Sequence, residues 1–400
     1  MSMGGAARAW ARDVRTDATM KTVLLLLLLA VGSLVALSLT VLTSASLLDA
    51  APGVAMTSQV VACGIGAMAL LGAASMDHGR WLRLAWPLFG VTLAMLVLVL
   101  LFGPKINGAR RWLLGVQPAE LAKLALVVVL SMHGARRASE MRDAWAAAWG
   151  GLVLAGPLIA LVLVEPDRGT AALLLALTAM LLLVAGARWW MIAGPALAGV
   201  GLIAVMIALS PMAQGRIGAW LHPEQNPKEY HQVRRGLLAF GSGGVEGTGL
   251  GKGTMKLSVP EFRTDFILPA VGEELGLLFT LGVVGAYLVI LWAGATIAAR
   301  APDRFGQLLA CGITFLVAMQ ASINIGVVTG VLPNKGIPLP FVSRGGSNLV
   351  VLMAMVGILA SVARAADGGE EDDERPGGGR RSRQRPGNPF KPDDEWVGAA

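Results

Sequence analysis

Long apolar runs recur along most of the chain, and each is close to the thickness of a lipid bilayer. The first run, Val23–Leu42, contains no charged residue, and about 20 mostly apolar residues carry a helix across the hydrocarbon core. Further runs predict helices at Val54–Ser75, Leu82–Gly103, Glu120–His133, Ala147–Val164, Gly169–Gly186, Met191–Leu209, Phe266–Trp292, Phe305–Gly330 and Ser347–Val362. The pattern predicts an all-α, polytopic membrane protein with about ten transmembrane helices.

The composition leads to the same fold class. Of the 400 residues, 55% are apolar and only 15% are charged, whereas soluble domains carry about 25% charged residues. The first apolar run is longer than that of a cleavable signal peptide, so we expect it to be retained as a helix. Cys63 and Cys311 both fall inside predicted helices, which indicates neither a disulfide framework nor a metal-ligand spacing.

The positions of the basic residues predict how these helices are oriented. A net charge of +7 could indicate nucleic-acid binding, but the basic residues are divided among loops and one tail. Three groups obey the positive-inside rule when both termini are cytoplasmic: Arg8, Arg12, Arg15 and Lys21; Arg136, Arg137 and Arg142; and Arg300 and Arg304. We therefore expect cytoplasmic termini and no nucleic-acid partner.

The chain divides into three predicted regions. Residues 1–22 form a cytoplasmic segment, residues 23–364 the membrane domain, and residues 365–400 a cytoplasmic tail whose Gly, Pro and charge content is typical of disorder. The end of the tail, Asn388–Trp396, has two aromatic residues that would alternatively suit a partner-binding peptide. Between the seventh and eighth helices, residues 210–265 form a large extracytoplasmic loop, and we expect irregular backbone to concentrate on this outer side.

The outer loops carry many cations, against the positive-inside trend. They are Lys105, Arg110, Arg111, Arg168, Arg216, Arg234, Arg235, Lys252, Lys256, Arg263, Lys335 and Arg344. Arg and Lys are the residues that bind phosphate, so these cations suggest a polyanionic ligand at the outer membrane surface. The alternative is that they pair with nearby acids, namely Glu120, Glu165, Asp167, Glu273 and Glu274.

The segment that leads into the fourth helix combines cations with an indole. Arg110, Arg111 and Trp112 suit a position at the level of the lipid headgroups, where Trp112 would act as an anchor. Glu120 and Lys123 open the helix at positions i and i+3, a spacing at which they could simply neutralise each other.

Two further segments surround the start of the eighth helix. The glycine-rich stretch Tyr230–Thr254 would let the backbone approach a ligand and present N–H groups to phosphate, although it does not match a P-loop. In Pro260–Gly276, either Thr264 or Asp265 could cap the helix. Glu273 and Glu274 lie inside the apolar pattern, so we expect at least one to face an internal cavity or a cation.

The connection between the last two helices cannot be a regular helix. Pro333, Pro338 and Pro340 predict a rigid, re-entrant segment. Ser343 and Arg344, next to two glycines, could hold an anion. A purely structural loop is the alternative.

Taken together, these segments resemble the SEDS family of cell-wall polymerases, the FtsW and RodA proteins, over all but the two ends. The shared motifs are Asn107–Trp112 with Gln117-Pro118, Pro166–Thr170, Gly241–Gly244, Pro260-Glu261 with Thr264–Phe266, Gly272–Gly276, and Pro338–Phe341 with Gly345–Ser347. Gly272–Gly276 and Asn334–Gly336 look more like the division-type FtsW branch than the elongation-type RodA branch. The chain departs from the usual motifs at Arg263, Arg344 and Asn348, and at Arg235-Gly236; the family usually has a tyrosine at the position of Arg344.

The resemblance implies a peptidoglycan glycosyltransferase in the bacterial cytoplasmic membrane. It would polymerise lipid II, a disaccharide-pentapeptide on undecaprenyl diphosphate, with inversion at the outer face. The family's essential aspartate aligns with Asp265, the expected catalytic base. The expected substrate-binding residues are Arg110, Arg111, Trp112, Lys123, Arg216, Lys252, Lys256, Glu261, Ser343 and Arg344.

The resemblance also implies protein partners. These are a class B penicillin-binding protein transpeptidase and other proteins of the division or elongation complex. No cofactor or metal ligand is assigned, and the participation of a divalent cation is left open. Two other functions stay open: a lipid II flippase, which would bind the same substrate, and a non-catalytic scaffold of the division complex.

Overall fold

The computed structural model describes residues 19–46, 54–106, 109–254 and 262–373. Ten helices in these ranges are long and apolar enough to cross a membrane, as the apolar runs predicted. They are α2 (Met20–Ser46), α3 (Val54–Ser75), α4 (His78–Phe102), α5 (Pro118–Arg136), α6 (Trp145–Val164), α7 (Arg168–Ala185), α8 (Trp189–Ala208), α11 (Ile267–Arg300), α12 (Arg304–Val328) and α13 (Gly346–Asp373).

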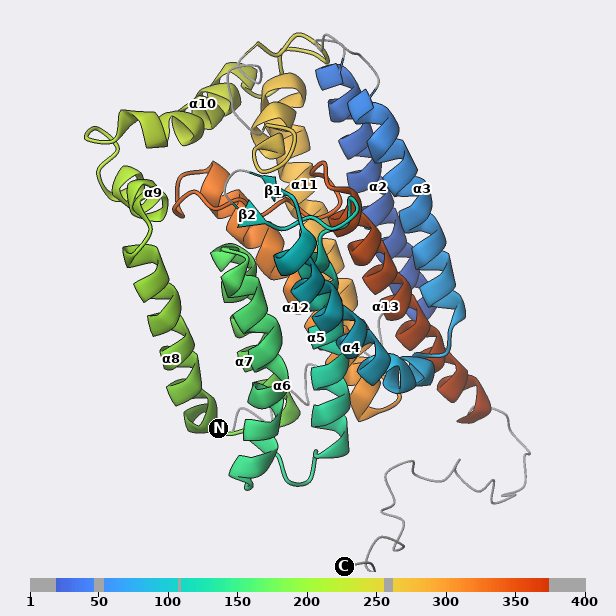
Figure 1. Ribbon diagram of the computed structural model, residues 1–400. Helices are drawn as coiled ribbons and strands as arrows, with labels where there is room; N and C mark the ends of the chain where they lie inside the picture. Colours follow the sequence, from blue (N-terminus) through green and yellow to red (C-terminus); the bar gives the residue numbers. More distant parts are fainter. Residues whose placement is uncertain (1–18, 47–53, 107–108, 255–261, 374–400) are drawn as a thin grey trace, which may run out of the picture.

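The helices form one bundle around α5, which is the most buried of the ten spans. Helices α4, α7 and α12 pack on α5, while α13 packs closely on α3 at one side. Helix α8 is the least buried span, and Figure 1 shows it at the edge of the bundle, apart from α2 and α3. Most side chains on the outside of the bundle are apolar, as expected for surfaces that face lipid.

The long loop between α8 and α11 differs from the prediction of irregular backbone. It contains two helices, α9 (Pro211–Leu221) and α10 (Pro227–Gly243), which Figure 1 shows at one end of the bundle. Each helix begins with proline, which suits the first turn of a helix because proline lacks an N–H group. Helix α10 packs against α11, where the Phe240 ring lies beside Gly272, and Val233 and Ala239 of α10 are buried.

The glycine-rich turn that follows α10 binds α11 instead of presenting its N–H groups to a ligand. The N–H groups of Thr248 and Gly249 donate to the carbonyls of Glu273 and Glu274 (2.9 and 3.0 Å). The Glu273 carboxylate accepts from the N–H of Thr254 (2.7 Å). The prediction that this stretch presents its N–H groups to phosphate is therefore wrong for Thr248, Gly249 and Thr254, whose N–H groups are bonded to α11.

Glu274 shows why two acids are tolerated inside an apolar helix. Both Glu273 and Glu274 are 1% exposed. The Glu274 carboxylate accepts hydrogen bonds from the hydroxyl of Ser44 on α2 (2.7 Å) and from the N–H of Gly251 (3.2 Å). A buried carboxylate requires hydrogen-bond partners. By providing them, Ser44 and Gly251 also connect α2 and the turn after α10 to α11.

Two further features lie at opposite ends of the molecule. The strands β1 (Lys105–Ile106) and β2 (Ala109–Arg110) form a small antiparallel ribbon after α4. At the other end of the chain, α13 continues to Asp373, so the start of the tail that was predicted as disordered is helical. The predicted peptide Asn388–Trp396 lies outside the described residues.

The contact between α10 and α11 leads to a prediction about two neighbouring glycines. A Cβ at residue 243 would lie 1.9 Å from the carbonyl oxygen of Gly272, whereas a Cβ at the exposed Gly241 would meet nothing within 4 Å. We expect Gly243→Ala to lower the free energy of unfolding by about 1–3 kcal/mol, because the two backbones must separate. Gly241→Ala should leave it unchanged or raise it by up to about 1 kcal/mol, since alanine favours helix.

Thermal unfolding of the detergent-solubilised variants measures the difference. Equal melting temperatures for the two variants would mean that α10 does not pack on α11 as described.

Candidate active site

A cavity of about 290 Å³ lies at the end of the bundle that carries β1 and β2. Its walls come from α5, α7 and α12, from the segment 331–345 between α12 and α13, and from the residues just before α11. Six charged residues line it: Arg111, Glu120, Lys123, Asp167, Asp265 and Arg344. Their formal charges sum to zero, with three cations and three carboxylates.

Asp265 is held in the cavity wall by its backbone. The side-chain amide of Asn324, on α12, donates to the carbonyl of Asp265 and also to the carbonyl of Ile337 (both 2.8 Å). Helix α11 begins at Ile267 with Phe266 as its N-cap residue and no side-chain cap. The expectation that Thr264 or Asp265 caps this helix is therefore wrong, and the Asp265 carboxylate faces the cavity instead.

The segment 331–345 fits closely around Asp265. The Ser343 hydroxyl donates to the carbonyl of Thr264, and the N–H of Arg344 donates to the carbonyl of Arg263 (2.8 Å). A Cβ at Gly336 would lie only 2.8 Å from Oδ2 of Asp265. A glycine is therefore required at position 336 for the segment to pass beside the carboxylate in its present position.

Glu120 and Lys123 form the buried ion pair that their spacing suggested. The Lys123 Nζ and a Glu120 carboxylate oxygen are 2.6 Å apart, and both side chains are almost fully buried. Because both also line the cavity, the pair presents a cation and a carboxylate to a ligand together. Removal of either partner would leave an uncompensated buried charge, which is strongly destabilising.

The two arginines of the segment between α4 and α5 have different positions. Arg111 lines the cavity, and its guanidinium donates to the carbonyls of Glu165 and Pro166 (3.2 and 2.6 Å). Arg110 donates instead to the carbonyls of Leu100 and Leu101 (3.0 and 2.7 Å), at the C-terminal end of α4. A cation there complements the helix dipole, so its observed contacts are structural.

Trp112 and Asp167 complete the polar wall. Trp112 lines the cavity, a position that suits contact with a substrate better than a purely lipid-facing anchor. Asp167 is the N-cap residue of α7 and accepts from the N–H and the hydroxyl of Thr170 (3.1 and 2.9 Å). Asp167, Gln320 and Asn348 were not among the predicted site residues, although Asp167 lies in a motif that the sequence analysis had singled out.

Of the remaining predicted residues, Arg216, Lys252 and Ser343 do not line this cavity. Arg216 is exposed on α9 and Lys252 is exposed in the turn after α10. Ser343 is buried, and its hydroxyl is bonded to the backbone of Thr264 and Leu339. Lys256 and Glu261 lie outside the described residues. A substrate-binding role for these residues stays a prediction.

The described parts of the chain contain no group of three or more His, Cys, Asp or Glu side chains that could hold a metal ion.

Comparison with known proteins gives one family over most of the chain. The model of the FtsW/RodA/SpoVE family, described as cell cycle protein, matches residues 18–368. The chain is 36% identical over 352 residues to the probable peptidoglycan glycosyltransferase FtsW of Trichlorobacter lovleyi, a match that covers 85% of this chain and 92% of that relative. It is 34% identical over 317 residues to the stage V sporulation protein E of Bacillus subtilis, covering 76% and 86%.

Solved structures with the same fold cover a similar share of the chain. One comes from a peptidoglycan synthase complex in which polymerization and crosslinking are coordinated; the TM-score is 0.69 at 29% identity, over 84% of this chain and 96% of that one. Another is the rod shape determining protein RodA of Thermus thermophilus, with a TM-score of 0.63 at 29% identity, over 84% and 95%.

Glu165, beside the cavity, is a buried acid with an unusual proton affinity. It is fully buried, and neither carboxyl oxygen has a hydrogen-bond partner in the described structure. Burial, reinforced by the nearby Asp167 carboxylate, raises the pKa of Glu165 to about 8, although Arg111 opposes the shift. Glu165 is therefore protonated in the folded protein at neutral pH.

This raised pKa predicts a pH dependence of stability. Between the ordinary pKa of 4.5 and about 8, the folded state retains a proton that the unfolded state releases, so stability falls as pH rises through this window. Glu165→Gln should remove this part of the pH dependence, whereas Glu140→Gln, at an exposed acid, should retain it. Apparent unfolding temperatures from pH 5 to 9 provide the measurement, and identical slopes for wild type and Glu165→Gln would refute the assignment.

Proposed function

The chain belongs to the FtsW/RodA/SpoVE family of cell cycle proteins, and on that premise we propose that it is a peptidoglycan glycosyltransferase that polymerises lipid II. The observation that carries the proposal is the position of Asp265, in a cavity that also presents Arg111, Lys123 and Arg344. An inverting transfer from a diphosphate-linked sugar requires a base near the attacking hydroxyl and cations near the leaving group. Of the three lining carboxylates, Glu120 is paired with Lys123 and Asp167 caps α7, so Asp265 is the one proposed as the base.

The reaction assigns a separate task to the carboxylate and to the cations. Asp265 accepts the proton of the 4-hydroxyl of one lipid-linked sugar as that oxygen attacks the anomeric carbon of the other. The bond from the anomeric carbon to the diphosphate breaks, and the lipid diphosphate leaves with the electron pair. Cations close to the leaving group stabilise the charge that develops on its oxygens.

Of the cations that line the cavity, Arg344 is the one best suited to stabilise the leaving diphosphate. Lys123 shares its charge with Glu120, and Arg111 is bonded to two backbone carbonyls. Arg344 stands where the family usually has a tyrosine, so this chain adds a cation to the wall. Trp112 offers an aromatic face against which a sugar ring can pack.

The proposed orientation places the cavity outside the cytoplasm. With ten spans, an even number, both ends of the membrane domain lie on the same side of the membrane. Figure 1 shows that α13 ends on the side of the bundle away from α9 and α10. The positive-inside rule assigns that side to the cytoplasm, because Arg136, Arg137, Arg142 and Arg300 lie there. The substrate would then be polymerised at the outer leaflet.

The proposed partner is a class B penicillin-binding protein transpeptidase. Support comes from the structural similarity to a chain of a peptidoglycan synthase complex that coordinates polymerization and crosslinking. Relatives named FtsW at about 35% identity favour a role in cell division.

A lipid II flippase would need a polar path through the bilayer. The polar cavity of this structure instead lies at one end of the bundle, where Glu120 and Lys123 are in the first two turns of α5. This position favours polymerisation over transport.

Replacement of Asp265 tests the proposed activity. In vesicles that contain purified protein, its transpeptidase partner and lipid II, we expect the wild type to form glycan strands. Asp265→Ala should lower the rate by roughly 100-fold or more, because the base is lost, while its melting temperature stays close to that of the wild type. Full polymerisation by this variant would remove Asp265 as the base, and lipid II transfer without any polymer would favour the flippase.

Gly336 offers a second test, which leaves the carboxylate in place. Gly336→Ala should displace the Asp265 side chain, since the new Cβ would lie 2.8 Å from its oxygen, and a displacement of about 1 Å can cost roughly 100-fold in rate. Polymerisation rates and melting temperatures of Gly336→Ala and the surface variant Gly241→Ala would be compared. A fully active Gly336→Ala would show that the reaction tolerates a displaced carboxylate.

A further inference from the structure

The proposed reaction brings two lipid-linked molecules to Asp265 together. One loses its diphosphate, while the other supplies the attacking hydroxyl and keeps a diphosphate of its own. The cavity, at about 290 Å³, is near the lower limit of ligand pockets. A space of this size does not hold two sugar diphosphates, so one diphosphate must lie beyond the lining residues.

Lys335 lies between this cavity and α10. On one side, the amide of Asn334 donates to the side chain of Gln232 on α10 (2.8 Å). On the other side, Gly336 faces the Asp265 carboxylate. The carbonyl of Lys335 accepts from the N–H of Ile337 (2.9 Å), so the chain turns sharply and Gly336 forms the tip of the turn. Lys335 itself is not a lining residue.

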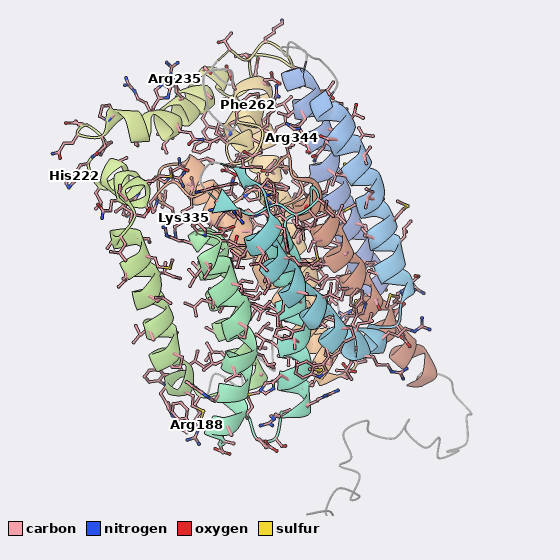
Figure 2. The ribbon with its side chains drawn as sticks, in the orientation of Figure 1. Arg188, His222, Arg235, Phe262, Lys335 and Arg344 are labelled. Atoms are coloured by element: carbon pink, nitrogen blue, oxygen red, sulfur yellow. The ribbon has the colours of Figure 1, made fainter. Side chains whose placement is uncertain are left out.

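Lys335 and Arg344 flank Asp265 from opposite sides. The residue just before the segment, Gly330, is fixed to α9, because its carbonyl accepts a hydrogen bond from the indole N–H of Trp220 (3.2 Å). The end of the segment is near α3, where the Arg344 guanidinium contacts the hydroxyl of Ser58 (3.5 Å). Figure 2 shows the same arrangement, with Lys335 on the side of α8 and α9 and Arg344 nearer to α2 and α3.

The ammonium group of Lys335 has no counter-ion among the described residues. It is half-buried and forms no salt bridge with any acid in the described residues. Burial lowers the pKa of Lys335 below its ordinary value, because removal from water disfavours the charged form. A cation in this situation is stabilised when an anion binds beside it, whereas the cavity cation Lys123 already has Glu120.

We propose that Lys335 binds the diphosphate of the second lipid-linked substrate, on the α9–α10 side of Asp265, while the cations that line the cavity bind the diphosphate of the first. This inference rests on the polymerase function proposed above and adds a position for the other substrate. A lysine suits this task because its ammonium group binds phosphate as a point charge on a flexible stem. A purely structural lysine is the competing explanation, and it predicts no effect on substrate affinity.

The kinetic test compares three variants in the vesicle assay with the transpeptidase partner. Lys335→Gln should raise the lipid II concentration at half-maximal rate by roughly tenfold or more, with a smaller change in maximal rate, because a charge-assisted contact is lost. Lys335→Arg should retain most of the affinity. Lys105→Gln removes a cation that is exposed and lies outside the cavity, and it should behave like wild type.

A binding test separates this inference from the polymerase function. Farnesyl diphosphate should raise the melting temperature of the wild type and of Asp265→Asn, and this increase should be smaller for Lys335→Gln. If the wild type makes no polymer but Lys335→Gln still loses this stabilisation, the polymerase function fails and Lys335 remains a diphosphate site.

Two outcomes overturn the inference. The first is an active wild type with unchanged lipid II dependence in Lys335→Gln. The second is farnesyl diphosphate stabilisation that is absent from the wild type, or is lost in Arg344→Gln but fully retained in Lys335→Gln.

Discussion

The site depends on one buried amide. Asn324, 1% exposed on α12, donates to the carbonyl of Asp265 and to that of Ile337. Neither carbonyl belongs to a regular helix, and irregular backbone at membrane depth is stable only when its polar groups find partners inside the protein. By supplying both hydrogen bonds from one side chain, Asn324 holds the backbone of Asp265 next to the segment 331–345.

The same requirement accounts for the polar layer around the site. Ser343 donates to the carbonyl of Thr264, and the Tyr287 hydroxyl donates to the carbonyl of Pro340, so the proline-rich segment is bonded to α11 and to the residues before it. Glu273 and Glu274 accept the N–H groups of the turn after α10 in the same way. The loops over the bundle therefore form a fixed structure, and a fixed structure is needed to hold a base and a leaving group in register.

The sequence predicted what depends on local pattern. Runs of apolar residues located all ten spans, and the i,i+3 spacing anticipated the Glu120–Lys123 pair. Helices α9 and α10 were missed because their short apolar stripes are interrupted by charges and glycines. The sequence did not distinguish the cations that line the cavity from the others. Charge and loop position predicted Arg110, Arg216 and Lys252 on the outer side, but the position of each side chain relative to the cavity depends on tertiary packing. In the structure, Arg111, Lys123 and Arg344 line the cavity.

The charge balance explains why the cations outside the lining matter. Arg111, Lys123 and Arg344 are matched in number by Glu120, Asp167 and Asp265, so the residues that line the cavity have no net formal charge. A neutral polar cavity suits the reacting sugars, whose hydroxyl and anomeric carbon are uncharged until the transition state. The proposed diphosphate positions lie on either side of Asp265, with Arg344 on one side and Lys335 on the other. Separate positions for the sugars and the diphosphates would keep the Asp265 carboxylate away from groups of the same charge, so that Asp265 stays ionised until it accepts the proton of the attacking hydroxyl.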